Sequence, residues 1–195
     1  MQASIPSTAA PVAAAHRSPI SPHERLTGLG MVPLGRATEF ADEIYSLMAK
    51  TPLFSGLDIA ETRALGAFMY VYDAPAGLTL ITEGDGGDFM VMLMSGMVDV
   101  LRRNRYNYPS RIAVAHAGHA LGEMSMFDGE PRFASCVTLE SCRIAVLTRD
   151  SLMLVLQEEP RLGSKILLKL VQLLSDRLRQ TSARLVSYLE SARDG

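Results

Sequence analysis

Glu123 and Arg132 carry opposite charges and stand nine positions apart in an otherwise apolar region, within the stretch LGEMSMFDGEPRFASC at 121–136. A buried carboxylate or guanidinium is costly unless a partner satisfies it. The two side chains can form an ion pair beneath a loop, or each can hold part of a polar ligand. The spacing alone leaves both interpretations open.

The residue types around this pair suit a nucleotide. The Gly-Glu pair at 122–123 is expected to open a short helix, whose first backbone N–H groups favour an anion. Arg132 suits a phosphate because its planar fork donates two parallel hydrogen bonds, and the small Ala134 and Ser135 let an anion approach the main chain. Glu123 cannot bind a phosphate, but it can accept hydrogen bonds from a sugar hydroxyl.

The elements that must position these residues follow from the periodicity. Residues 1–36 are rich in Ala, Pro, Ser and Gly without any period, and we interpret them as a disordered tail. Helical spacing begins at Ala37, and from Val71 apolar residues alternate between Gly and Asp turns, which indicates strands. From Ser151 the period returns to 3.6, ending in a long helix over about 161–192.

This order predicts one domain over 37–195, mostly β with flanking helices. About eight short strands indicate a jelly-roll (double-stranded β-helix) barrel, with short helices before it and the long C-terminal helix after it. The apolar stripe of that helix is longer than a small β domain covers, so we expect its end to form a homodimer. The stripe consists of Ile166, Leu170, Leu173, Leu174, Leu178, Leu185 and Leu189.

The bulk composition excludes several classes of protein. The 195 residues are 48% hydrophobic with a net charge of −2, so a basic excess for nucleic-acid binding is missing. No apolar run approaches the roughly 20 residues of a membrane span, and the N-terminus lacks a secretory signal pattern. Cys136 and Cys142 are expected as buried, reduced thiols, which favours the cytoplasm.

The stretch LGEMSMFDGEPRFASC resembles the phosphate-binding cassette of the cyclic nucleotide-binding domain family, which reads Gly-Glu, a short helix, then Pro-Arg followed by small residues. The catabolite activator protein, the regulatory subunit of protein kinase A and cyclic-nucleotide-gated channels share that fold. The resemblance covers about residues 38–192. It also includes PLFSGL (52–57), APAG (74–77), EGDGGDFMVMLMSGMVDV (83–100) and GHALGE (118–123).

The resemblance implies roles for the cassette residues. Arg132 would pair with the equatorial oxygen of a cyclic phosphate, and Glu123 would hold the ribose 2′-hydroxyl. Backbone N–H groups of Ser125, Phe133 and Ala134 would help to hold the sugar-phosphate. The full set of residues expected to bind the ligand is Gly122, Glu123, Met124, Ser125, Arg132, Phe133, Ala134, Ser135 and Ile112.

The identity of the base depends on two further positions. Members of the family that select cGMP carry Thr or Ser directly after the Arg, whereas this chain has Phe133, which favours cAMP and leaves cGMP as the alternative. Thr181 and Ser182 match the pair that contacts adenine in the catabolite activator protein, if about one helical turn is inserted after Pro160. Without that insertion Arg177 and Leu178 would cap the base, and an exposed patch of helix is the alternative for Thr181 and Ser182.

The function implied by the resemblance is a cAMP sensor that is not an enzyme and needs no cofactor besides its ligand. The chain ends at Gly195, three residues after the expected helix end, so we expect no DNA-reading helix and no DNA or membrane partner. Its output would be a shift of the long helix about a hinge near Pro160, read by an effector protein.

Two other functions stay open. The same fold can serve as a dimerisation or docking module without a ligand, in which case Arg132→Ala would leave its function intact. His116, His119 and Glu123 also faintly resemble the metal motif of cupin enzymes, because His and Glu side chains can hold a divalent metal. The cupin spacing is H-x-H rather than H-x-x-H, and no His follows His119 in the chain.

Overall fold

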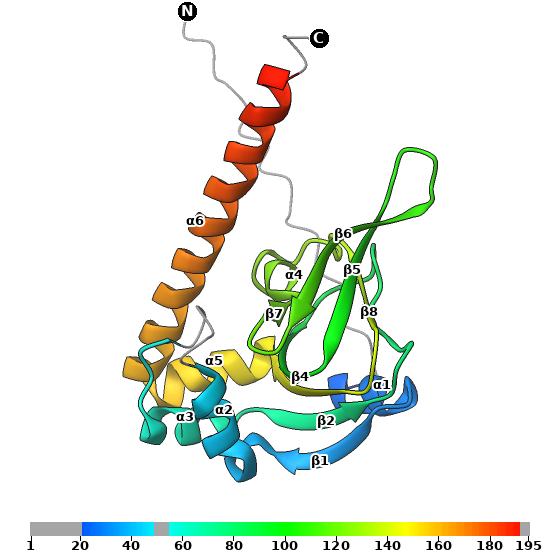
Figure 1. Ribbon diagram of the computed structural model, residues 1–195. Helices are drawn as coiled ribbons and strands as arrows, with labels where there is room; N and C mark the ends of the chain where they lie inside the picture. Colours follow the sequence, from blue (N-terminus) through cyan, green and yellow to red (C-terminus); the bar gives the residue numbers. More distant parts are fainter. Residues whose placement is uncertain (1–20, 49–54, 192–195) are drawn as a thin grey trace, which may run out of the picture.

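The computed structural model of the protein describes residues 21–48 and 55–191 (Figure 1). Within these ranges nine strands form two sheets, in which every neighbouring pair of strands is antiparallel. The five-stranded sheet has the order β1 (Val32–Arg36), β2 (Tyr70–Ala74), β9 (Cys142–Thr148), β4 (Phe89–Ser95) and β7 (Ala120–Leu121). The four-stranded sheet has the order β3 (Thr79–Ile81), β8 (Ser135–Thr138), β5 (Met97–Arg103) and β6 (Pro109–His116).

The predicted class, mostly β with flanking helices, is confirmed, but closure into a barrel is not. No strand pair joins the two sheets among the described residues. The sheets meet through side chains instead, in an inner core that includes Leu80, Val91, Val98 and Ile144. The architecture is therefore two antiparallel sheets packed face to face.

A second core lies on the other face of the five-stranded sheet, where the helices cover it. These helices are η1 (Ala37–Phe40), α2 (Ala41–Met48), α3 (Ile59–Gly66), α5 (Arg149–Glu158) and α6 (Pro160–Ser191). Along β4, Met90, Met92 and Met94 face the helices, while Val91 and Leu93 face the inner core. Because β4 is buried on both faces, its methionines fill the core, as their alternation predicts.

The predicted disordered tail over 1–36 is wrong for residues 21–36. Helix α1 (Pro22–Gly28) begins with a capping box between Ser21 and Glu24, and β1 pairs with β2. Leu26 is 1% exposed and Met31 is 3% exposed, and both belong to the inner core. The Ala/Pro/Ser-rich part of the tail, residues 1–20, lies outside the described residues.

Helix α6 divides into two parts with different surroundings. Leu162, Ile166 and Leu170 are buried against the rest of the domain. Beyond them the helix extends along one side of the molecule, and Leu178 and Leu185 are exposed (Figure 1). The predicted start at about residue 161 agrees with the structure within one residue, and the helix continues to Ser191, the last described residue. Within the described ranges, no helix is both long enough and apolar enough to span a membrane.

Candidate functional site

Helix α4 (Glu123–Asp128) lies between β7 and the segment that leads into β8, and Gly122 sets its direction. Gly122 has φ +77°, a left-handed conformation that side chains rarely adopt. A Cβ atom at this position would lie 2.5 Å from Nη1 of Arg132 and 2.8 Å from Cδ1 of Ile81. Glycine therefore allows both the sharp entry into α4 and the close approach of the guanidinium.

Arg132 is 4% exposed and is held by neutral oxygens. Its Nη1 donates to the carbonyl of Gly122 at 2.6 Å, and its Nη2 donates to the carbonyl of Phe89 at 2.8 Å. The backbone is held as well, because the N–H of Arg132 donates to the carbonyl of Asp85 at 2.8 Å and its carbonyl accepts from Gly84 at 2.9 Å. Burial lowers the pKa of Arg132, and the nearby Asp88 opposes that shift.

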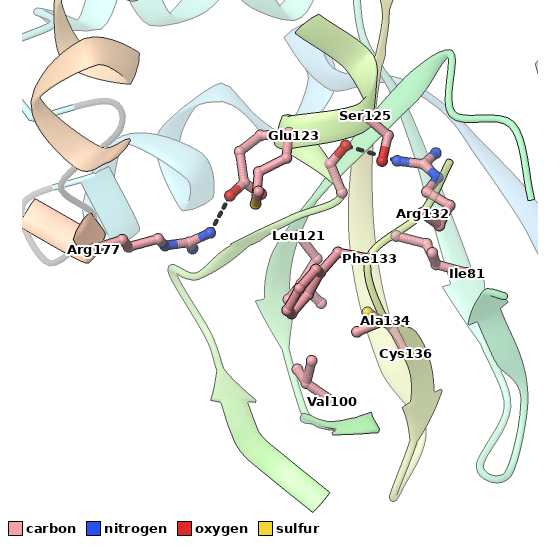
Figure 2. A pocket seen from close by; sticks show the side chains of 12 residues that line it. Ile81, Val100, Leu121, Glu123, Ser125, Arg132, Phe133, Ala134, Cys136 and Arg177 are labelled. Carbon is pink, nitrogen blue, oxygen red and sulfur yellow. Dashed lines mark hydrogen bonds and ion pairs between the residues drawn. The ribbon is translucent and has the colours of Figure 1, made fainter. Parts of the chain in front are cut away.

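Glu123 is 1% exposed, yet its partner in the described chain is not Arg132. Arg177 of α6 forms an ion pair with it, and Nη2 of Arg177 also donates to the carbonyl of Ala120 at 3.1 Å. Burial raises the pKa of Glu123, and the guanidinium of Arg177 acts in the opposite direction. Figure 2 shows Arg177 and Arg132 on opposite sides of the segment that carries Glu123.

These residues surround a cavity of about 100 Å³ that is open to solvent. Most of its lining is apolar, and the charged groups converge from α4, α6 and the segment before β8 (Figure 2). An apolar wall with two cationic groups, on Arg132 and Arg177, and the anionic Glu123 can orient a ligand that carries both a phosphate and a hydroxyl.

Most of the predicted site residues come together in this cavity. The lining contains Gly122, Glu123, Met124, Ser125, Arg132, Phe133, Ala134 and Arg177. The hydroxyl of Ser135 instead accepts a hydrogen bond from the N–H of Glu83 at 2.9 Å, and Ile112 is 48% exposed on β6. Thr181 and Ser182 are exposed on α6 and do not line the cavity of the described chain.

Four residues that line the cavity were not predicted from the sequence. Ile81, Val100, Leu121 and Cys136 also line the cavity. Their signal is the alternation along short strands, which places every second side chain on the inner face. Arg177 was expected only as a cap for the base, and its pairing with Glu123 depends on the placement of α6, which the sequence does not encode locally.

The residues of the alternative metal motif do not gather around a common point. His116 donates its backbone N–H to Nδ1 of His119 at 3.1 Å, while Glu123 faces Arg177. Among the described residues, no group of three or more His, Cys, Asp or Glu side chains could hold a metal ion.

Comparison with known proteins finds the same kind of domain in other chains. The family model of the cyclic nucleotide-binding domain matches residues 73–159. A crystal structure of a cyclic nucleotide-binding domain from Methylobacillus flagellatus KT is 40% identical, with a TM-score of 0.73, covering 80% of this chain and 88% of that one.

Two curated relatives are named as regulators. The CRP-like cAMP-activated global transcriptional regulator of Mycobacterium tuberculosis is 27% identical over 143 residues, which are 73% of this chain and 62% of that protein. The cAMP-dependent protein kinase regulatory subunit of Aspergillus niger is 32% identical over 105 residues, 54% of this chain and 25% of that protein. The chain thus spans less than two thirds of either curated relative. The chain belongs to the cyclic nucleotide-binding domain family, because it matches the family model, resembles the domain from Methylobacillus and shares the two-sheet fold.

Proposed function

We propose that this protein is a sensor of cyclic nucleotides, with cAMP as its ligand, and that it signals to an effector protein through α6. The observation that carries the proposal is one cavity with two buried, oppositely charged anchors that do not pair with each other, Glu123 and Arg132. A site with this arrangement gains from a ligand that brings its own anion and its own hydroxyl donor.

Arg132 is the proposed anchor for the cyclic phosphate. Among the described residues it makes no ion pair with a carboxylate, and its two hydrogen-bonded acceptors are backbone carbonyls. A bound phosphate would supply the negative charge that these neutral partners lack, and it suits the planar guanidinium, which can donate two parallel hydrogen bonds to it. The N–H groups of Ser125, Phe133 and Ala134 are proposed to contact the same sugar-phosphate.

Glu123 is the proposed anchor for the ribose. A carboxylate offers about four lone-pair directions, so pairing with Arg177 leaves capacity for a sugar hydroxyl. The preference for cAMP rests on Phe133, which lines the cavity and carries no hydroxyl for a guanine. Of the proposed base caps, Arg177 already lines the cavity, whereas Thr181 and Ser182 would need a movement of α6 or a second copy of the chain.

Helix α6 is the proposed output of the sensor. Among the described residues of α6, Arg177 alone lines the cavity, and it contacts both Glu123 and the carbonyl of Ala120. A ligand that binds Glu123 changes the charge and the space that Arg177 meets, so it biases the position of α6. The proposal of a cytoplasmic protein agrees with the free, buried thiols of Cys136 and Cys142.

The exposed part of α6 supports a homodimer. Apolar residues repeat there with the spacing of a two-stranded coiled coil, at Val171, Leu174, Leu178, Leu185 and Tyr188. Leu178 is 69% exposed and Leu185 is 58% exposed, although both belong to this repeat. Thr181 occupies the remaining core position and would lie at the interface of the two helices.

The first prediction concerns the phosphate anchor. In calorimetric titration with cAMP, Arg132→Ala should weaken binding by about 2–5 kcal/mol, since it removes one partner of a buried charged contact. Arg143→Ala is the matched control, because Arg143 pairs with Asp73 on the sheet and does not line the cavity. An unchanged dissociation constant would contradict the site and favour the ligand-free docking module. Tighter binding of cGMP than of cAMP would overturn the base preference alone.

The second prediction concerns the buried carboxylate. Burial raises the pKa of Glu123 in the folded protein above the ordinary value of 4.5. The contribution of this carboxyl to the free energy of unfolding should therefore fall as the pH rises from 4.5 through its folded-state pKa. Glu123→Gln should therefore stabilise the ligand-free protein at about pH 8 but not at about pH 4, while weakening the binding of cAMP. Thermal unfolding across this range measures the effect, with the exposed Glu130→Gln as control. A pH-independent difference would refute the assignment.

The third prediction concerns the output. Binding of cAMP should change the hydrogen–deuterium exchange of α6 beyond residue 171, because Arg177 links that segment to Glu123. Arg177→Gln should abolish the change in α6 while the exchange of α4 still responds. Arg179→Gln, an exposed neighbour that pairs only with Asp176 among the described residues, should behave as the wild type. Exchange in α6 that ignores the ligand would exclude this route of signalling.

The fourth prediction concerns the dimer. Leu185→Glu should shift the protein from dimer to monomer in sedimentation velocity, because it places a charge in the apolar repeat. Ser187→Glu adds the same charge outside the repeat and should leave the dimer intact. A wild-type protein that sediments as a monomer at micromolar concentration would end the proposal.

A further inference from the structure

We propose that Arg25 of helix α1 is a positioning residue of the anion site, which neutralises Asp88 and so prevents this carboxylate from competing with a phosphate for Arg132. This inference rests on the proposed function, since it takes a cyclic phosphate as the ligand of Arg132. The family model matches residues 73–159, so the inference assigns a role in binding to a residue that precedes the matched region.

The contact between α1 and the site is direct. Arg25 forms an ion pair with Asp88, which stands between Gly87 and Phe89 at the start of β4. Helix α1 is itself held in place, because Leu26 is 1% exposed in the inner core and Nδ1 of His23 lies 2.6 Å from the hydroxyl of Tyr72. The guanidinium of Arg25 therefore reaches Asp88 from a fixed element.

Asp88 lies in a segment that packs on Arg132. A Cβ atom at Gly87 would lie 2.8 Å from Cζ of Arg132, and the carbonyl of Phe89 accepts from Nη2 of Arg132 at 2.8 Å. The Phe89 ring connects the two arginines, with its centroid 4.6 Å from Cζ of Arg132 and 5.9 Å from Cζ of Arg25. Both neighbours of Asp88 in the chain thus contact Arg132, while Asp88 itself is turned to Arg25.

The charges at this point determine the expected effect. An unneutralised Asp88 would attract Arg132 and repel an incoming phosphate, and both effects weaken binding. Salt screens charges beyond about 10 Å at 0.1 M, so a charge on a neighbouring segment still acts on Arg132. The ion pair with Arg25 neutralises Asp88 and so reduces both effects. Burial lowers the pKa of Arg132 while Asp88 raises it, which agrees with an electrostatic influence of Asp88 on that side chain.

The test is a double-mutant cycle in the full chain, with cAMP as the titrant. Arg25→Gln should weaken binding about tenfold, the size expected for coupled charges. Asp88→Asn should tighten binding, and the dissociation constant of the double variant should lie within about twofold of the wild-type value. The loss in Arg25→Gln should shrink at high salt.

A purely structural contact predicts a different pattern. In that case Arg25→Gln and Asp88→Asn weaken binding alike, and the double variant does not recover the affinity of the wild type. That pattern would overturn the inference. An unaltered affinity of Arg25→Gln would overturn it as well. If Arg25→Gln fails to fold, the sign of the effect of Asp88→Asn still decides. Arg143→Gln, which breaks a similarly exposed pair with Asp73, is the control. A wild-type protein that binds neither cAMP nor cGMP would refute the proposed function, and the inference with it.

Discussion

The carboxylate of Glu123 is almost fully buried, so its negative charge needs a compensating positive charge in every position that α6 can take. In this structure the compensating charge comes from Arg177, on a helix that begins 37 residues after Glu123 in the chain. The cassette and the C-terminal helix are therefore joined by one electrostatic requirement. Under the proposed function, a change in the charge or hydration of Glu123 would therefore act on the part of α6 that carries Arg177.

The cassette was predictable because its geometry is encoded locally. The residues around Gly122 predict the start of a helix. The structure explains why this position is a glycine, because its φ is positive and Arg132 occupies the space that a Cβ atom would need. The start of the long helix was also predictable within a residue, from a 3.6-residue period and Pro160. These features depend on propensities and spacing, which a single sequence contains.

What could not be predicted depends on contacts between distant segments. The pairing of Glu123 with Arg177 needs the angle at which α6 leaves α5, and the separation of the two sheets needs the full set of strand pairings. Helix α1 is a different case, because Ser21 and Glu24 with Pro22 between them form a recognisable capping box that was overlooked within an apparently disordered tail. Only tertiary contacts reveal that Arg25 reaches Asp88 from that helix.

The division of α6 into a buried and an exposed part has a mechanical consequence. Residues 171–191 extend beyond the anchor at Leu170 by about 30 Å, at 1.5 Å per residue. A tilt of about 10° at the anchor would displace the far end of the helix by about 5 Å, roughly one helical turn. A small shift beside Glu123 would thereby become larger at the tip of the helix, so the effector of the proposed function would not need to approach the nucleotide.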